Sequence, residues 1–234
     1  MKIDTDLVKN RIFNSAIVPS LLKHSNEYKV LAVLRYFYPE KYNTMIHSEA
    51  PDLQDPTNGI GIEVTNAVRE SDLKASRLLS ELRQDNPDDV EKKKMLIESL
   101  GYRFSSIDNV NAINATGTDD GDKLVFQSII IKKLKKLQKY RIKFKKIGLA
   151  ILLPEIPTSS AEENYMEWIL EINKEANDNF DFFYFISYRF CIYYNIHNKT
   201  VTKRLIGKEE GRSLFTIARM TAEGELSLND LEWQ

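Results

Sequence analysis

The chain has 234 residues, of which 42% are hydrophobic and 29% are charged, and its formal net charge is −1. This length and apolar content suit one sizeable globular domain with small appendages. The near-neutral charge excludes a histone-like protein that binds nucleic acid through bulk charge, but it permits an enzyme with a local concentration of charge. The single cysteine, Cys191, excludes an internal disulfide framework, and its apolar neighbours indicate a buried packing residue.

The sequence carries no pattern typical of export or of a membrane protein. Residues 1–6 lack the basic start and apolar run of a signal peptide. No stretch approaches the roughly 20 consecutive apolar residues that a membrane-spanning helix needs. We therefore expect a cytoplasmic protein with no membrane partner.

The predicted elements alternate between helical and strand patterns along the chain. The clearest helix start is Asn26, a favourable N-cap, and the clearest strand is the continuous apolar run over 147–153, which ends at Pro154. The chain is expected to begin with an N-terminal arm over 1–25, whose end falls near Pro19 or Ser25. The expected order after it is a helix over 26–37, strands over 44–53 and 60–66, helices over 71–83 and 90–100, a polar loop over 102–122, a basic helix over 126–141, a strand over 147–153, a helix over 162–177, strands over 182–188, 191–196 and 200–205, and a polar tail or small subdomain over 207–234.

This order predicts an α/β fold in which a central mixed β-sheet is covered by helices on both faces, in three αβα layers. The main domain is expected over 26–206. The arm before it and the segment after it are expected to be appendages.

The most informative segment is 47–65, which places Pro51-Asp52 before a Pro/Asn/Gly turn and then a short apolar strand whose only charge is Glu63. Alternate residues of a strand point to opposite faces, so Glu63 shares a face with Gly61 and Thr65. We expect this face to be open beside the glycine, where a ligand can approach. Hard cations such as Mg²⁺ are usually held by one or two carboxylates together with water and substrate phosphate.

The pattern Pro51-Asp52 followed by Glu63-Val64-Thr65 resembles the PD-(D/E)XK nuclease superfamily, which has the restriction-endonuclease-like fold. The resemblance implies that Asp52 and Glu63 bind Mg²⁺ or Mn²⁺, with the backbone carbonyl of Val64 as a third ligand. Many members of the family add a glutamate from the first helix. Glu27 occupies the start of that helix here, and Glu49 on the first predicted strand is the other candidate for an extra ligand.

The chain departs from the family pattern at Thr65, which stands where the family has lysine. Threonine cannot supply the positive charge that orients the attacking water, although its hydroxyl can still hydrogen-bond a metal-bound water. Family members with a displaced lysine take it from a helix packed on the sheet. The resemblance therefore makes Lys133 the first choice for this role and Lys136 the second.

The helical pattern over 126–141 supports the same two lysines. Phe126, Ile130, Leu134 and Leu137 form an apolar seam at helical spacing. Lys133, Lys136 and Tyr140 border this seam, whereas Lys132, Lys135 and Lys139 lie on the opposite, solvated side. The alternative is that these lysines only extend their side chains from the edge of a buried helix into solvent and have no catalytic role. Between Lys132 and Lys146 there are nine basic residues and no acidic one, a composition that suits phosphate binding.

The predicted function is metal-dependent hydrolysis of phosphodiester bonds, most plausibly in DNA, with Asp52, Glu63, Thr65, Lys133 and Lys136 as the catalytic candidates. One alternative is an inactive protein of the same fold that binds nucleic acid or a protein partner. Another is an ordinary α/β interaction protein whose carboxylates are surface residues. The histidines, His24, His47 and His197, are far apart and lack the spacing of a zinc site, although His47 lies near Asp52 in sequence. The sequence leaves open whether the chain forms a homodimer.

Overall fold

The structure of the protein is a computed structural model that describes residues 19–67, 70–82, 87–107, 110–115, 119–153, 159–176 and 178–233. Most of the expected N-terminal arm lies outside these residues. Within them, no helix combines the length and the apolar character needed to cross a membrane.

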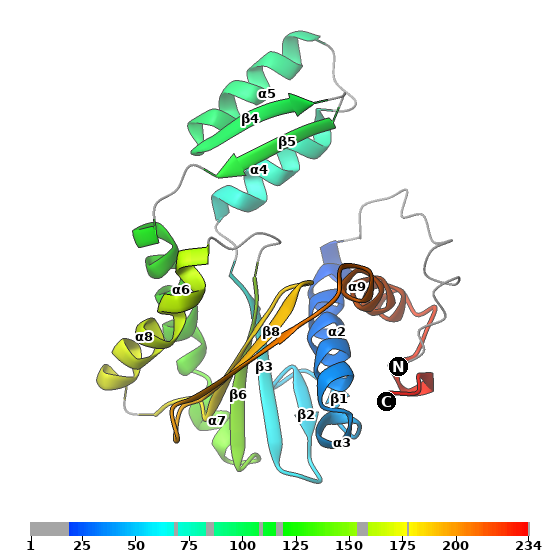
Figure 1. Ribbon diagram of the computed structural model, residues 1–234, viewed down its shortest axis with the longest axis vertical. Helices are drawn as coiled ribbons and strands as arrows, with labels where there is room; N and C mark the ends of the chain where they lie inside the picture. Colours follow the sequence, from blue (N-terminus) through cyan, green and yellow to red (C-terminus); the bar gives the residue numbers. More distant parts are fainter. Residues whose placement is uncertain are drawn as a thin grey trace.

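A mixed seven-stranded sheet forms the centre of the protein (Figure 1). Its strands, in sheet order, are β1 (Ile46–His47), β2 (Leu53–Asp55), β3 (Ile60–Asn66), β6 (Lys146–Leu152), β7 (Phe182–Ile186), β8 (Phe190–Asn195) and β9 (Thr200–Leu205). Strands β3, β6 and β7 run parallel, and the remaining neighbours pair antiparallel. The predictions for 60–66 and 200–205 match the observed strands, and that for 147–153 is shifted by one residue.

Helices cover both faces of this sheet. One face packs against α2 (Pro19–Phe37), α3 (Pro39–Tyr42) and α9 (Lys208–Ala222), and the other against α6 (Asp119–Leu134), α7 (Leu137–Arg141) and α8 (Ser159–Glu175). Strand β6 shows why: Ala150 and Leu152 enter the first core, whereas Leu149 and Ile151 enter the second. The predicted α/β class with a mixed sheet between helices is confirmed, and the arrangement is compatible with three αβα layers.

Two expected boundaries near the start of the domain are wrong. Helix α2 begins at Pro19 rather than at Asn26, so residues 19–25 belong to the helix and not to an arm. The single strand expected over 44–53 is replaced by the short strands β1 and β2, which pair antiparallel across a turn. Asp52 therefore directly precedes a strand, and Glu49 lies in the turn with its side chain exposed rather than on a strand.

The region expected as a polar loop over 102–122 instead contains a β-hairpin, β4 (Tyr102–Ile107) paired with β5 (Val110–Ala115). Together with α4 (Glu70–Glu81) and α5 (Pro87–Ser99), this hairpin forms a unit inserted between β3 and α6. The unit has a small core of its own, made by Ala75, Leu82, Ile97 and Tyr102. Figure 1 shows the unit beyond one end of the central sheet.

The segment from residue 207 onward is neither a tail nor a separate subdomain. Helix α9 places Leu214 and Ile217 in the same core as Val30 and Leu34 of α2. These apolar residues recur at helical spacing among charged ones, so the polar average composition hid an amphipathic helix. The 3-10 helix η1 (Leu228–Asp230) follows and adds Leu228 to the same core.

The buried guanidinium of Arg35 connects α2 to the chain just before β1 and to the C-terminal segment around η1. Its Nη2 donates to the Met45 carbonyl at 2.8 Å and to Asn229 Oδ1 at 2.9 Å, and its Nε donates to the Tyr42 carbonyl at 3.3 Å. The guanidinium thereby fixes the chain just before β1 and the C-terminal segment against the same helix. Because Arg35 is only 1% exposed, water cannot replace these hydrogen bonds.

We predict that Arg35→Met lowers the free energy of unfolding by roughly 1–3 kcal/mol, because the buried Met45 carbonyl loses the donor of its hydrogen bond and the Tyr42 carbonyl keeps only the Met45 N–H. Urea denaturation followed by circular dichroism measures this loss. Arg212→Met is the matched control, since the ion pair of Arg212 with Glu209 is exposed and its loss should cost under about 0.5 kcal/mol. Equal losses in the two variants would contradict the role given to Arg35.

Candidate functional site

The candidate site lies where β2 begins beside β3. The hydrogen-bond ladder between the two strands stops at the pair Leu53 and Ile62. The Val64 N–H and carbonyl, which face the side of β3 where β2 lies, therefore have no partner in β2. Two side chains replace the missing strand. Asp52 Oδ2 accepts the Val64 N–H at 2.8 Å, and Lys133 Nζ donates to the Val64 carbonyl at 3.0 Å.

Glu63, one residue earlier on β3, is fully buried and is hydrogen-bonded on both oxygens. Lys133 and Lys136 donate to Oε1 at 2.7 Å and 2.6 Å, and the Tyr140 hydroxyl donates to Oε2 at 2.6 Å. The three donors come from the end of α6, the turn after it, and α7, and they cover the face that the sequence predicted to be open. That expectation is wrong, because this segment packs over Glu63.

These contacts set the ionisation of Glu63. Burial raises the pKa of the carboxyl, but the hydrogen bonds and charges of Lys133 and Lys136 outweigh burial and lower it overall. Burial, and then the hydrogen bond to the Glu63 carboxylate, raise the pKa of Tyr140. Glu63 is thus a carboxylate at neutral pH, held by two ammonium groups and one neutral phenol.

Asp52 has the opposite shift. Burial, and then the charge of Glu63, raise its pKa from 3.8 to about 6, against the Val64 N–H and Lys133, which act to lower it. The two carboxylates therefore lie close enough to repel each other, as neighbours across β2 and β3 should. Repulsion of this kind is what a bound cation relieves.

A third carboxylate approaches from α2. Lys23 Nζ lies 3.2 Å from Glu27 Oε1 and 3.5 Å from Asp52 Oδ1, so one ammonium joins the two acidic groups. Burial raises the pKa of Glu27, but hydrogen bonds with His47 and His24 outweigh it and lower the pKa to about 2. Glu27 therefore stands near the site, whereas Glu49 is exposed in the turn and acts on Lys23 through charge alone.

Gly61 allows the close approach that positions Asp52. A Cβ atom at residue 61 would lie 2.6 Å from Pro51 Cγ and 3.2 Å from the ring of Phe144. Any side chain there would displace Pro51 and with it the neighbouring aspartate. The glycine expected to leave space for a ligand instead leaves space for Pro51.

The structure brings together most of the residues that the sequence singled out. Asp52, Glu63, the Val64 carbonyl, Lys133 and Lys136 form one connected set of contacts. Thr65 lies on the same face of β3 as Glu63 and is half-buried. Tyr140, which the sequence placed only at the border of the helix seam, is a direct partner of Glu63.

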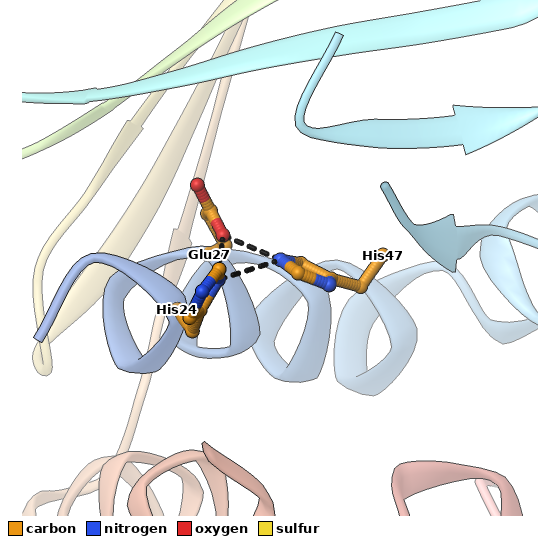
Figure 2. A group of neighbouring side chains, drawn as sticks. All are labelled: His24, Glu27 and His47. Carbon is orange, nitrogen blue, oxygen red and sulfur yellow. Dashed lines mark hydrogen bonds and ion pairs between the residues drawn. The ribbon is translucent and has the colours of Figure 1, made fainter. Parts of the chain in front are cut away.

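Sequence reasoning missed a cluster of two histidines beside this set (Figure 2). His24 on α2 and His47 on β1 are 23 residues apart, yet His24 Nδ1 and His47 Nε2 lie 3.2 Å from each other. Both ring nitrogens also face Glu27 Oε2, at 3.1 Å and 2.5 Å. The sequence offered one signal, the i, i+3 spacing of His24 and Glu27. The cluster could not be predicted because His47 is 23 residues from His24 in the sequence.

No family model, no curated protein and no solved structure matches the chain. The contacts of its own residues are therefore the basis for any functional assignment.

The raised pKa of Asp52 predicts a stability that depends on pH. Below its ordinary value of 3.8 the side chain is neutral in both folded and unfolded chains, whereas above about 6 it is ionised in both and its burial opposes folding. We therefore expect Asp52→Asn to raise the free energy of unfolding by roughly 1–2 kcal/mol at pH 8 and to change it little near pH 4.

Urea denaturation of both proteins at the two pH values measures this difference. Asp55→Asn is the control, because the pKa of Asp55 is lowered by hydrogen bonds with Asn58 and Thr44 that outweigh burial. This substitution should destabilise the protein at pH 8. A loss of stability in Asp52→Asn at pH 8 would contradict the repulsion inferred between Asp52 and Glu63.

Proposed function

We propose that the protein hydrolyses phosphodiester bonds, most plausibly in DNA, with Mg²⁺ or Mn²⁺, and that its domain has the restriction-endonuclease-like fold. The observation that carries this proposal is the position of the Lys133 ammonium. It contacts both Glu63 Oε1 and the Val64 carbonyl, the groups beside which the lysine of the PD-(D/E)XK pattern is needed. Thr65 breaks the pattern in sequence, and a lysine from α6 supplies the missing charge in space.

The donor set suits a hard divalent cation. Asp52, Glu63 and the Val64 carbonyl offer only oxygen atoms, the ligand type that Mg²⁺ prefers. Burial and then the charge of Glu63 raise the pKa of Asp52, so a cation bound beside the two carboxylates would favour the ionised form of Asp52. When bound, the cation would polarise the scissile phosphate and acidify a water molecule.

The chain's own residues have separate roles in this proposal. Lys133, whose side chain is only 18% exposed, would orient the attacking water and offset charge that develops on the phosphate. Lys136 and Tyr140 position the Glu63 carboxylate, because each donates a hydrogen bond to a different one of its two oxygens. The Thr65 hydroxyl, on the same face as Glu63, is available to hydrogen-bond a water.

Exposed lysines near this set could hold the substrate. Lys136 contacts Glu63 and Lys23 contacts Asp52, and their side chains are 50% and 60% exposed, so both lysines extend from a buried carboxylate to the surface. Lys132, Lys135 and Lys139 on the solvated side of the same segment extend the positive surface and are all exposed. Such a surface binds the phosphates of a nucleic acid without reading its sequence.

A second candidate function is binding of nucleic acid without cleavage. The observation that favours it is the saturation of Glu63, whose two oxygens already accept hydrogen bonds from two lysines and a tyrosine. A cation would have to displace at least one of these donors. Cleavage assays separate the two functions, because both predict binding and only the first predicts hydrolysis.

For the enzyme, we predict that Lys133→Ala lowers kcat for Mg²⁺-dependent DNA cleavage by roughly 100-fold or more, because the Lys133 ammonium donates to both Glu63 and the Val64 carbonyl. Single-turnover cleavage of labelled duplex and single-stranded DNA at saturating protein measures the effect. Glu63→Gln should abolish cleavage, whereas Lys132→Ala, on the solvated side of the same helix, should keep it within about twofold.

Equal activity of the Lys133 and Lys132 variants would exclude the displaced lysine. Complete inactivity of the wild-type protein on DNA and RNA with either metal would favour the binding function. Circular dichroism melting of each variant shows whether a loss of activity is a loss of fold.

The proposed positive surface predicts an affinity that falls steeply with salt, since each phosphate contact releases counterions. Fluorescence anisotropy of a labelled duplex between 50 and 200 mM salt should show this dependence. Replacing Lys135 and Lys139 together by alanine should reduce the slope of log affinity against log salt by about 2. Lys208→Ala, on α9, should leave the slope unchanged, and an affinity independent of salt would exclude this surface.

A further inference from the structure

The cluster of His24, Glu27 and His47 is separate in its chemistry from the all-oxygen set around Glu63. Its three facing atoms, His24 Nδ1, Glu27 Oε2 and His47 Nε2, are mutually 2.5–3.2 Å apart. Among the described residues, these are the side chains whose ligand atoms converge as a metal site requires. Figure 2 shows His24 and Glu27 projecting from α2 toward His47.

With Glu27 ionised, at most two of the three contacts can be hydrogen bonds. If both ring nitrogens donate to Glu27 Oε2, the third contact brings two donor nitrogens to 3.2 Å from each other with no acceptor between them. If one nitrogen is a lone-pair acceptor, its contact with the carboxylate oxygen has no hydrogen. A cation among the three atoms accepts a lone pair from each of them at once.

The spacing also fits a first-row transition metal. Zinc bonds of about 2.0–2.1 Å in a tetrahedral site place neighbouring ligand atoms roughly 3.3 Å apart. The two contacts of His24 have this spacing, at 3.1 Å and 3.2 Å. The contact between His47 and Glu27, at 2.5 Å, would need to lengthen by under about 1 Å.

The protein holds these ligands in place while leaving one side accessible. His24 and Glu27 lie one helical turn apart on α2, and the His47 ring packs 4.9 Å from the ring of Tyr28. The Glu27 side chain is 2% exposed, whereas those of His24 and His47 are 35% and 21% exposed. Three protein ligands with an open side are the arrangement of sites that keep a water or substrate as fourth ligand.

We propose that His24, Glu27 and His47 form a binding site for a transition-metal ion, with Zn²⁺ as the best fit. Two imidazoles and one carboxylate favour such an ion over Mg²⁺, which prefers oxygen ligands. Lys23, which contacts both Glu27 and Asp52, lies between this site and the all-oxygen set. The inference does not depend on nuclease activity, since it rests on the geometry of the three ligands alone.

Titration with Zn²⁺ by isothermal calorimetry and by competition with a chromophoric chelator tests the proposal. Metal-free wild-type protein should bind one equivalent with micromolar or tighter affinity and at least 100-fold more tightly than Mg²⁺. His24→Ala and His47→Ala should each weaken Zn²⁺ binding at least 100-fold. The control is His197→Ala, because His197 lies on the exposed turn after β8 and should leave the affinity unchanged.

A spectroscopic readout separates this site from the all-oxygen set. Co²⁺ in place of Zn²⁺ should give the visible absorption bands of a tetrahedral nitrogen-containing site, and Glu63→Gln should leave these bands in place. His24→Gln, on the accessible face of the helix, provides a second variant if His47→Ala does not fold. Absence of stoichiometric Zn²⁺ binding, binding unaffected by either His24 variant, or loss of binding in a Glu63→Gln protein whose circular dichroism matches that of the wild type would overturn the proposal.

Discussion

The buried charge of Glu63 is the constraint on which the centre of this protein depends. A carboxylate in the middle of a covered strand costs several kcal/mol unless donors compensate for its lost hydration. Lys133, Lys136 and Tyr140 provide that compensation, and all three come from a single short segment. Packing of this segment over β3 is therefore coupled to the ionised state of one side chain.

The break between α6 and α7 follows from the same requirement. Lys133 lies in the last turn of α6, Lys136 lies in the turn after it, and Tyr140 lies within α7. Their spacing of three and four residues keeps them on one face across the break. The apolar seam of the segment enters the core formed with α8, so the polar groups reach β3 along its border. Core packing and charge compensation thus specify the same orientation of this segment.

The sequence predicted the class of fold because apolar periodicity reports burial directly. Strand β6 is an unbroken apolar run, and β3 alternates around a single charge, so both could be placed within a residue. The short strands β1 and β2 were predicted as one strand over 44–53, because their apolar content is low and their pairing depends on a turn. Helix α9 was missed for a related reason, since its apolar stripe is diluted by charged residues in the average composition.

The candidate site was predictable where it depended on local sequence and not where it depended on long-range packing. The Pro51-Asp52 and Glu63 pattern lies within one short segment. Helical spacing placed Lys133, Lys136 and Tyr140 along one border of the apolar seam, and the resemblance to the nuclease family then made Lys133 the first choice. The approach of His24 to His47 depends on how α2 lies against β1, which no local pattern encodes. The open face expected at Glu63 was wrong for the same reason, because the covering segment is about 70 residues away in sequence.

Charge balance explains how the two proposed metal sites would influence each other. Glu27, Asp52 and Glu63 bring three carboxylates together, and Lys23, Lys133 and Lys136 bring three ammonium groups. This neutrality means that an added cation must displace an ammonium group or leave an excess of positive charge. Lys23 is the group that leaves at least cost, because its side chain is 60% exposed and regains water when it moves.

Displacing Lys133 would cost more, since its side chain is largely covered and donates to both Glu63 and the Val64 carbonyl. Movement of Lys23 would release Glu27 Oε1 and Asp52 Oδ1 together, because the same ammonium contacts both. A cation on either side of Lys23 would then alter the electrostatic field at the other side. The exposed lysine, rather than the buried one, is therefore the element through which occupancy of the two sites would be coupled.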